Sequence, residues 1–371
     1  MNKVIFFTGA KPPQTGGEFY NYQLCQYLQK IGWEHEYVSL HQKRHYIRLS
    51  KIPIFGSSLV SLIFVVILFK YRGYLVEDHF FSKYLWFTNF IHKFFFKDKI
   101  IVIVHLFYGY DTRDKLLIRR IINGIIEKIR LSLADLIITS SEYSKNEIVS
   151  VGINPDLVHV LSPGLDRDKF NLSFNLSSSS DELNYKNSKK ILCVGNYVPR
   201  KGIIYLIKAL SQIQYKEFTL DLVGNRKDNS SYYNLLINAV EKLKLTECVV
   251  FHDGANQENL KQLYASADIF VLPSLKETFG IVFLEAMHYG LPIITTNVSA
   301  MPELVKQGQN GILVPPADSQ ALAEAITTLI EQPNLIKQMG EYGRKKVANS
   351  YYWEHTCSKF VSIIENMNKQ Q

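Results

Sequence analysis

Short apolar runs recur along the chain, each bounded by glycine, proline or small polar residues. Longer stretches lie between them, with apolar residues returning every three or four positions, which is the period of an amphipathic helix. Runs without polar alternation are typical of strands covered on both faces of a sheet. The predicted strands are the segments KVIFFTG, HEYVSL, KIIVIVHL, ADLIITSS, KILCVGN, FTLDLVGN, VVFHDG, DIFVLPS and LPIITTN.

Helices are predicted between these strands. The segment GEFYNYQLCQYLQKIG ends at Gly32, and glycine is common where helices stop. Further helices are predicted at residues 115–132, from Gly202, at residues 230–243, at residues 257–266, and from Gly280 to about Gly290.

This alternation of strand and helix occurs in two blocks and indicates an α/β protein with two doubly wound parallel sheets. Residues 170–190 separate the blocks; they are polar, rich in serine and without apolar periodicity, as is typical of a linker. We therefore expect one domain at residues 1–169 and a second at residues 191–351. A length of 371 residues also favours two cores over one.

Composition describes a globular protein, with 47% hydrophobic and 20% charged residues. The scattered cysteines argue against a zinc knot or a disulfide framework and favour a reducing compartment. The first apolar run is too short for a signal-peptide core, so a cytoplasmic location is expected. The cysteines are Cys25, Cys193, Cys248 and Cys357.

The net charge of +8 is concentrated in the first half of the chain. Residues 1–169 hold 22 Lys and Arg against 15 Asp and Glu, and the rest is close to balanced. A nucleic acid, an anionic membrane or an acidic substrate could each account for this excess.

Three loops that follow predicted strands carry candidate chemistry, because ligands of doubly wound sheets bind at the carboxyl ends of the strands. The first is TGAKPPQTGG, where Gly16 and Gly17 allow a close backbone approach and open a helix that favours an anion. It is neither a Walker loop nor a G-x-G-x-x-G loop. The alternative is a flexible loop with a helix cap.

The second loop is VGNYVPRKG, which places Arg200 and Lys201 at the mouth of the second sheet. Lysine is a compact charge suited to phosphate, and arginine offers a planar fork. Taken alone, an exposed basic pair is more often a solvated turn.

The third loop lies in SLKETFGIVFLEAMHYGLP. Free backbone N–H groups at Gly280 and Ile281 would face an anion at the helix start. Glu277 and Glu285 could accept hydrogen bonds from hydroxyl groups. The alternative for each is a helix-dipole or surface acid. The three loops together favour a ligand with phosphates between two hydroxyl-rich sugars, which is a nucleotide-sugar.

With these residues in place, the sequence resembles the retaining glycosyltransferases of family 4, which have the GT-B architecture. The third loop matches the family's E-x7-E motif. The match extends over nearly the whole chain and is weakest at residues 42–96. Further matching segments are SEYSKNEIVSVGINPDLVHVLSPGLDRDKF, VPRKG, LYASADIFVLPS and PELVKQGQNGILVPPAD.

The resemblance implies two Rossmann-like domains facing across a cleft, with the acceptor on the N-terminal side. A C-terminal helix at residues 352–371 would complete the first domain. The implied activity is hexosyl transfer from a nucleotide-sugar to a glycan, lipid-linked or polysaccharide-precursor acceptor, with retention of configuration.

The resemblance also assigns roles to residues. Glu277 would contact the transferred sugar, Glu285 the ribose, and Lys201 the diphosphate. His105 matches a histidine often found at the family's reaction centre; its alternative is a structural histidine at a strand end. The remaining donor-binding candidates are Gly16, Gly17, Arg200, Phe279, Gly280 and Ile281.

One position departs from the family pattern. Family members usually carry an arginine directly after the strand glycine, and this chain has Asn196 there. Arg200 is a candidate to compensate for it.

The implied mechanism is front-face substitution, in which the departing diphosphate helps to deprotonate the acceptor. No metal and no cofactor are required. Asp166 and Asp168 spell the D-x-D of metal-dependent GT-A transferases, but no strand that would present a metal surrounds them.

The acceptor side contains a basic and apolar window. Residues 43–130 hold 16 basic and 6 acidic residues. Its segment SLVSLIFVVILF is too short to span a bilayer, and its segment YLWFTNFIHKFFFK has aromatic residues at helical spacing with lysines beside them. Aromatics with lysines suit an anionic membrane interface, so peripheral attachment to the inner face of the membrane is expected; the alternative is two core helices with a solvated basic face.

Other function classes stay open. A nucleotide-sugar epimerase of the GT-B fold needs no acceptor, and a catalytically weak partner subunit needs no turnover. A nucleic-acid binder would explain the charge but not the three loops, so no nucleic-acid partner is expected.

Overall fold

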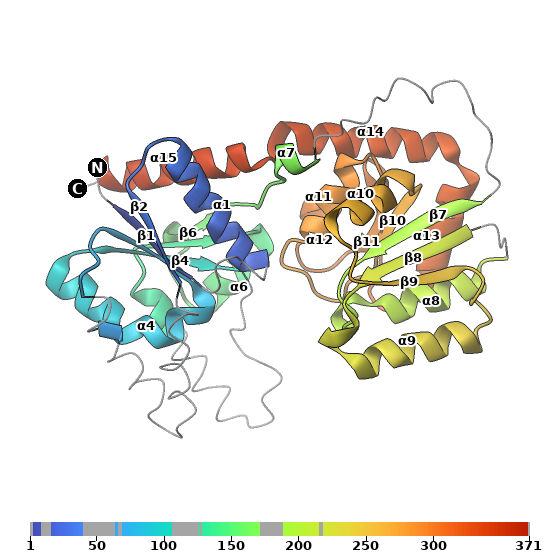
Figure 1. Ribbon diagram of the computed structural model, residues 1–371, viewed down its shortest axis with the longest axis horizontal. Helices are drawn as coiled ribbons and strands as arrows, with labels where there is room; N and C mark the ends of the chain where they lie inside the picture. The colour runs from blue at the N-terminus through green and yellow to red at the C-terminus, as the bar shows by residue number, and fades with distance from the viewer. Residues whose placement is uncertain are drawn as a thin grey trace. The chain divides into compact units, whose positions relative to one another are not determined.

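A computed structural model describes residues 3–8, 16–39, 64–65, 69–105, 125, 128–170, 188–214 and 218–369. The chain divides into two compact units (Figure 1). Unit 1 comprises Met1–Pro163 and Glu354–Gln371, and unit 2 comprises Gly164–Trp353. The C-terminal segment therefore clusters with the N-terminal part of the chain.

Unit 1 is built on a parallel sheet with the strand order β2-β1-β3-β4-β5-β6. Strands β4 and β5 are continuous apolar runs buried on both faces, as predicted, whereas the edge strands β2 and β6 are only partly buried. The strands are β1 (Val4–Thr8), β2 (His35–Ser39), β3 (Tyr74–Asp78), β4 (Lys99–Val104), β5 (Leu136–Thr139) and β6 (Val158–Val160).

The described helices of unit 1 connect these strands or cover the sheet. The predicted first helix is confirmed, and it ends two residues before Gly32, whose φ of 76° is the left-handed conformation that glycine adopts readily. The helices are α1 (Gly16–Lys30), α4 (His79–Ile91), the π-helix η3 (His92–Phe96), α6 (Glu142–Ser150), the 3-10 turn η4 (Pro155–Leu157) and α15 (Trp353–Lys369).

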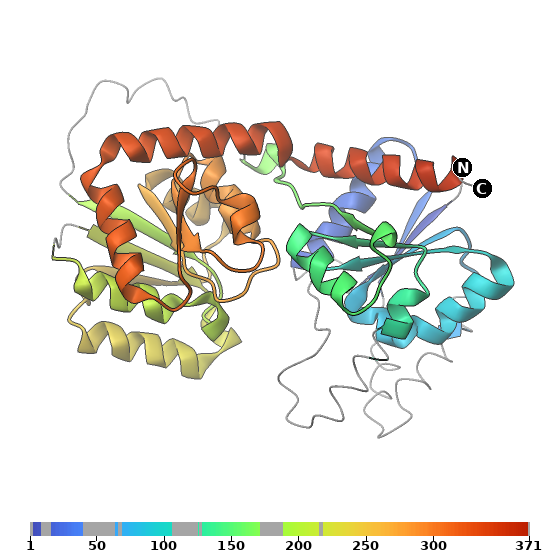
Figure 2. The same ribbon diagram turned by 180° about the vertical axis from the view of Figure 1, so that it is seen from behind.

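Helix α15, the red helix at the C-terminus, lies along unit 1 (Figure 2), and side-chain contacts hold it there. Phe360 packs on Phe6 of β1 with ring centroids 6.3 Å apart. The Thr356 hydroxyl donates to the Ser162 carbonyl at 2.7 Å. These contacts join the two ends of the chain in one unit.

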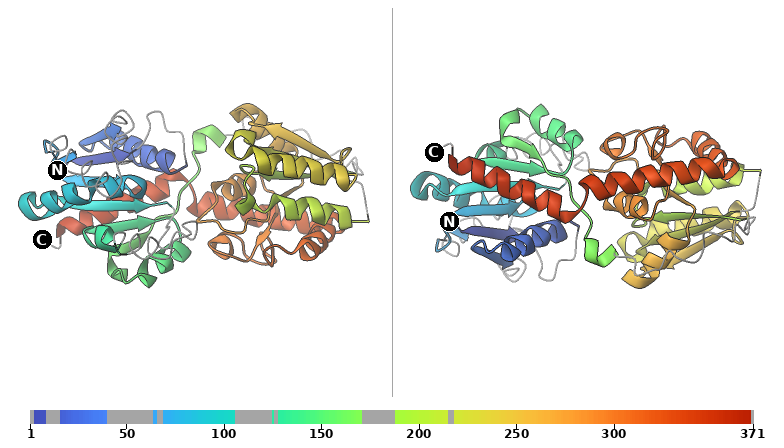
Figure 3. Two further views of the ribbon diagram at one scale, coloured as in Figure 1. Left: turned by 90° about the horizontal axis from the view of Figure 1, so that it is seen from below. Right: turned by 90° about the horizontal axis from the view of Figure 1, so that it is seen from above.

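Unit 2 repeats the architecture, with the parallel order β12-β11-β10-β7-β8-β9. Helices α8 and α9 lie side by side (Figure 3). The strands are β7 (Lys189–Val194), β8 (Phe218–Gly224), β9 (Val249–Asp253), β10 (Ile269–Leu272), β11 (Ile293–Thr296) and β12 (Gly311–Val314). The helices are α7 (Arg167–Phe170), η5 (Pro199–Lys201), α8 (Ile203–Gln212), η6 (Arg226–Asp228), α9 (Ser230–Lys242), α10 (Gln257–Ser266), α11 (Ile281–His288), α12 (Met301–Leu304), α13 (Ser319–Glu331) and α14 (Pro333–Ser350).

The predicted α/β class and the parallel sheets are confirmed, and each predicted strand corresponds to an observed one. Three further short strands, β3, β6 and β12, were not among the predictions. Most of the predicted helix at residues 115–132, most of the segment at 58–69 and residues 171–187 of the linker lie outside the described residues.

Candidate active site

The strand order places the candidate residues of unit 2 together. The order along the sheet reverses between β7 and β10, which are neighbours, and such a switch point is where ligands bind in open α/β sheets. The loop after β7 carries Arg200 and Lys201, and the loop after β10 carries Glu277. The loops Val194–Gly202 and Ser274–Gly280 therefore meet at one sheet edge.

Lys201 and Glu277 form a buried ion pair. The Lys201 ammonium lies 2.5 Å from Glu277 Oε2, and both residues are less than a tenth exposed. Arg200 Nη1 lies 3.3 Å from Glu277 Oε1, although its own side chain is half exposed. The Ser274 hydroxyl lies 3.4 Å from the same carboxylate. Glu277 is thus held by two cations of different accessibility.

This arrangement keeps Glu277 ionised. Burial by itself would raise the pKa of Glu277, but the charges and hydrogen bonds of Lys201 and Arg200 outweigh it and lower the pKa overall. An ionised carboxylate only accepts hydrogen bonds, so Glu277 is suited to hydroxyl groups. Lys201 has three N–H donors, of which Glu277 uses one.

Gly202 makes the close approach of the two loops possible. Its φ is 68°, and a Cβ there would come 2.0 Å from the Pro273 carbonyl oxygen. The Leu275 amide donates to the Arg200 carbonyl at 2.7 Å, which ties the loops together. A side chain at Gly202 would push Lys201 away from Glu277.

Helix α11 begins at Ile281, with Gly280 as its N-cap. No side chain caps its first turn, so the N–H groups at this end have no side-chain acceptor from the N-cap. The φ of Gly280 is 85°, and a Cβ would come 2.5 Å from the Phe283 ring. Phe279 is buried and packs near Tyr351, so it supports the loop through the core.

Glu285 lies on α11 and is positioned by Tyr264 of α10. The Tyr264 hydroxyl donates to Glu285 Oε2 at 2.7 Å. Burial raises the pKa of Glu285, and the hydrogen bond from Tyr264 opposes this. Tyr264 itself stacks on Tyr289 at 5.4 Å, with the rings 11° from parallel. Tyr264 was not among the residues predicted from the sequence, because ten residues separate the end of its helix α10 from Glu277, where the motif begins.

The exposed Asn196 lies in the β7–η5 loop, and its carbonyl accepts from the Val198 amide at 2.7 Å. It occupies the position of the usual arginine. Arg200 lies on Glu277 and on the Lys276 carbonyl, at 3.3 Å from each. The nearest described arginine in sequence is therefore already engaged with the loop of Glu277.

Unit 1 gathers a second group of candidates at its own switch point, between β1 and β3. His105 follows β4, Gly17 opens α1 and Asp78 ends β3. A Cβ on Gly17 would lie 2.6 Å from His105 Cδ2, so glycine lets α1 pass directly against the ring. Gly16 is the first residue of α1.

His105 is oriented by two neighbours. Its Nε2 lies 3.7 Å from Asp78 Oδ2, and Tyr20 meets the ring edge-on at 5.2 Å. Asn21 donates to the same Asp78 oxygen at 3.3 Å. Burial lowers the pKa of His105, and the Asp78 charge opposes this. His105 is therefore neutral at pH 7 and can accept a proton.

Two further titratable groups with shifted pKa values lie nearby in the sequence, Glu77 on β3 and His79 on α4. Burial raises the pKa of Glu77 to about 8, while a hydrogen bond from Asn89 at 2.9 Å opposes the rise. Burial lowers the pKa of His79 to about 3, with Arg130 and His105 adding to the effect. Neither these groups nor Asp78 were predicted from the sequence; the signal that could have indicated them is a short strand that ends in two carboxylates, YLVED.

No group of three or more His, Cys, Asp or Glu side chains that could hold a metal occurs in the described part of the chain. Asp166 instead accepts from the Lys169 amide at 3.4 Å at the start of α7. Arg167 lies 4.3 Å from the Tyr352 ring centroid.

The structure thus places Lys201, Arg200 and Glu277 in one cluster and Gly17 and His105 in another. Glu285 is hydrogen-bonded to Tyr264. In each unit, the candidate residues lie at the carboxyl edge of the parallel sheet, near the point where the strand order reverses.

Comparison with known proteins identifies the two halves of the chain. Residues 177–346 match the family model "Glycosyl transferases group 1". Residues 15–169 match the model "Glycosyltransferase Family 4". Together the two models cover most of the chain.

Individual proteins that resemble the chain are 20–30% identical to it over the aligned residues. An uncharacterized glycosyltransferase of Methanocaldococcus jannaschii is 30% identical over 62% of this chain and 59% of its own length. A GDP-mannose-dependent alpha-(1-6)-phosphatidylinositol monomannoside mannosyltransferase of Mycolicibacterium smegmatis is 28% identical over 62% of each chain. The matched part thus spans about six-tenths of these relatives. The structure of a sucrose-phosphate synthase from Thermosynechococcus elongatus superimposes with a TM-score of 0.78 over the whole of both chains, at 20% identity, and shares the fold.

Proposed function

The chain belongs to the family 4 glycosyltransferases of the GT-B fold, and on that premise we propose that it transfers a hexosyl group from a nucleotide-sugar to a hydroxyl of a glycan, lipid-linked or polysaccharide-precursor acceptor. The observation that carries the proposal is the buried Lys201–Glu277 pair beside the uncapped start of α11. It offers a cation and N–H groups for a diphosphate, next to a carboxylate for sugar hydroxyls.

Unit 2 is the donor side of this proposal. The diphosphate would contact Lys201 and the amides of Gly280 and Ile281. Glu277 would accept hydrogen bonds from the transferred sugar, and Glu285 from the ribose. Because Tyr264 occupies one oxygen of Glu285, the other remains for a ribose hydroxyl.

We propose transfer with retention and without a metal. The bond from the anomeric carbon to the diphosphate oxygen breaks, and its electron pair leaves with the diphosphate. The acceptor oxygen bonds to the same face of the carbon, and its proton passes to the departing diphosphate. Lys201 stabilises the charge that develops on the diphosphate, and such preorganised groups contribute roughly 10²–10³ in rate. His105 of unit 1 is neutral and would serve the acceptor side.

Calorimetry with UDP, GDP and ADP tests the donor site. We expect one diphosphate to bind the wild type and to be lost in Lys201→Ala. Lys208→Ala, an exposed lysine of α8, is the matched control and should bind normally. Folded wild-type protein that binds none of the three would contradict the proposal.

Product analysis tests the chemistry. With donor and acceptor, the NMR coupling of the new anomeric proton should match that of the donor, and a chelator should not change the rate. Incubation with donor alone separates an epimerase, which would yield an altered nucleotide-sugar. Donor binding without any turnover across an acceptor panel would favour a partner subunit, with Asn196 as the departure that explains it.

We further propose that unit 1 attaches to an anionic membrane surface. Phe90, Phe94 and Phe95 of α4 and η3 are 41%, 61% and 69% exposed, and the basic excess of the chain lies in this half. None of the helices in the described ranges has the length and hydropathy needed to span a bilayer. Exposed aromatics with a basic field suit interfacial binding.

Vesicle flotation tests the attachment. Wild type should float with vesicles that contain phosphatidylglycerol, and Phe94→Ser/Phe95→Ser should float several-fold less. Leu235→Ser/Val250→Ser removes two comparably exposed apolar side chains from unit 2 and should behave as wild type. Equal flotation of both double variants would contradict this surface.

A further inference from the structure

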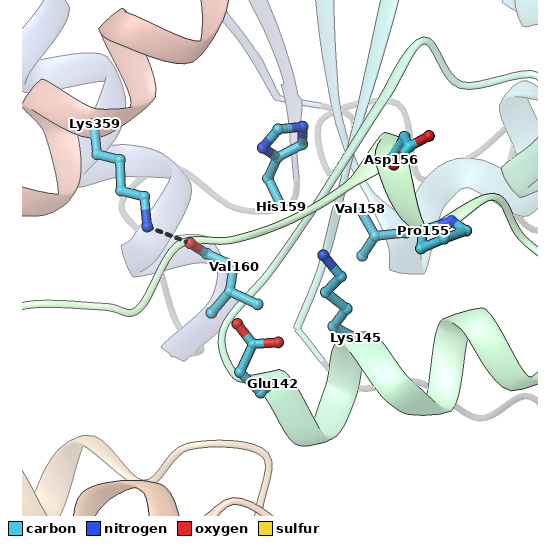
Figure 4. A pocket seen from close by; sticks show the side chains of 8 residues that line it. All are labelled: Glu142, Lys145, Pro155, Asp156, Val158, His159, Val160 and Lys359. Atoms are coloured by element: carbon cyan, nitrogen blue, oxygen red, sulfur yellow. Dashed lines mark hydrogen bonds between the residues drawn. The ribbon is translucent and has the colours of Figure 1, made fainter.

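A pocket of about 330 Å³ lies on unit 1, apart from the candidate site (Figure 4). It opens at β6, the edge strand of the sheet, and shares no residue with the cluster around His105. Its volume is at the lower end of the range for small-molecule sites. The lining residues are Glu142, Lys145, Pro155, Asp156, Val158, His159, Val160 and Lys359.

Three basic side chains from three elements line this pocket, with His159 and Lys145 on opposite sides of the β6 backbone. Lys145 comes from α6, His159 from β6 and Lys359 from α15 (Figure 4). The Lys359 ammonium donates to the Val160 carbonyl at 3.1 Å. Within the described ranges neither lysine forms an ion pair with a carboxylate at 4.0 Å or less, although Glu142 and Asp156 also line the pocket.

The charges of the two lysines affect the pKa of His159. Burial lowers the pKa of His159, and the Lys145 and Lys359 charges lower it further, against a hydrogen bond to the Asp156 backbone that raises it. His159 is therefore a neutral ring at pH 7, within the electrostatic reach of both lysines. A bound anion would reverse this balance.

The open edge of β6 adds a backbone donor. The Leu161 amide donates inward to the Thr139 carbonyl, so the alternation of a parallel strand turns the N–H and C=O of Val160 outward. The Val160 carbonyl accordingly meets Lys359. Its N–H lies on the same open edge, as is usual for an unpaired edge strand.

We propose that this pocket binds the phosphoryl group of a sugar phosphate, with Lys145 and Lys359 neutralising its charge and His159 and the Val160 N–H as donors. Point charges and donors from several directions suit a tetrahedral oxyanion better than a planar carboxylate. Glu142 and Asp156 line the same pocket and repel a bare anion, so they favour a ligand that presents hydroxyl groups beside its phosphate. The identification of this ligand as part of the acceptor rests on the proposed glycosyltransferase function.

NMR of the His159 imidazole tests the proposal, with the resonance assigned by His159→Gln. The probe is glucose 6-phosphate at constant ionic strength, in a Lys201→Ala background that removes the proposed donor site. We expect a saturable shift and a rise in the pKa of His159, with no response to glucose. Lys145→Ala/Lys359→Ala should weaken binding roughly tenfold or more. Lys30→Ala/Lys369→Ala removes two exposed lysines from the same unit and should respond as the parent does.

The absence of a saturable shift, or an equal response in both double-lysine variants, would overturn the phosphoryl site. Because binding is read at His159 without turnover, this failure is distinct from a failure of donor binding at Lys201. A second arm identifies the source of the phosphate. Sedimentation with phosphatidic acid vesicles that depends on Lys145 and Lys359 indicates a lipid-borne group, and an NMR response without it indicates a soluble one.

Discussion

The Lys201 ammonium lies 2.5 Å from Glu277 Oε2 although the two residues are 76 positions apart in the chain. The contact exists because β7 and β10 are neighbours in the sheet and both loops leave the same edge. The buried carboxylate partly offsets the desolvation free energy of the buried lysine, so a cation can be kept at a phosphate site when no phosphate is bound.

Neutralising Glu277 should therefore destabilise unit 2 in a pH-dependent way. Glu277→Gln leaves Lys201 buried without its counter-ion, which should cost on the order of 3–5 kcal/mol at pH 7. The folded-state pKa of Glu277 is lowered, so its contribution is present above the unfolded value near 4.3 and is lost as pH falls through the folded value.

Urea unfolding at pH 7 and at pH 3–4 checks this. The difference between wild type and Glu277→Gln should shrink on acidification. Glu241→Gln, an exposed glutamate of α9, should change stability little at either pH. A difference that does not depend on pH would argue against the ion pair as its origin.

Asp78 should keep the pKa of His105 higher than burial alone would allow. Removing the carboxylate charge in Asp78→Asn should lower the pKa of His105 further, because that charge is the group that opposes burial. An NMR titration of His105 measures this directly. The acid limb of kcat/KM should move to lower pH if neutral His105 is needed on the acceptor side.

Asp98→Asn is a matched control, since Asp98 pairs with a different histidine, His92, at 2.7 Å. It should leave the His105 titration unchanged. An unmoved His105 pKa in Asp78→Asn would remove Asp78 from the account of the site.

Glu77 should make unit 1 less stable as pH rises. Its folded-state pKa of about 8 lies above the unfolded value near 4.3, so the folded state holds a proton that the unfolded state lacks between these values. The stabilisation is complete below about pH 4.3 and is lost progressively up to about pH 8. Glu77→Gln keeps a neutral partner for Asn89 and should remove this slope.

We therefore expect Glu77→Gln to match wild type near pH 4.5 and to exceed it at pH 8 by an amount on the order of a few kcal/mol. Chemical unfolding across this range is the measurement. Parallel curves for the two proteins would show that Glu77 is ionised in the folded state.

Alanine substitutions at Gly202 and Gly254 distinguish the cost of backbone strain from the cost of a steric clash. Both have positive φ, 68° and 72°, but a Cβ at Gly202 meets the Pro273 carbonyl at 2.0 Å, whereas a Cβ at Gly254 has no atom within 4 Å. Gly254→Ala should cost about 1 kcal/mol, as expected for the left-handed conformation alone. Gly202→Ala should cost several kcal/mol and weaken diphosphate binding. Equal losses of stability would mean that the loops adjust freely.

Much of the fold was predictable because its signals are local. Continuous apolar runs indicated buried parallel strands, and glycine and proline marked helix ends, so the helix at Gln257–Ser266 was predicted to the residue. The strands β3, β6 and β12 were missed because none is a longer apolar run: β3 ends in two carboxylates, β6 has three residues with a histidine at its centre, and β12 has three apolar residues after its glycine.

The sequence by itself determined the chemistry of the loops: which residues carry charge, which glycines lack a side chain, and that these follow strands. Only the tertiary structure decided the partners, namely Glu277 for Lys201, Tyr264 for Glu285, Asp78 for His105, and Lys145 and Lys359 for His159. The physical reason is that periodicity and turn preferences act over a few residues. Strand order and the folding back of α15 onto unit 1, by contrast, join segments tens to hundreds of positions apart.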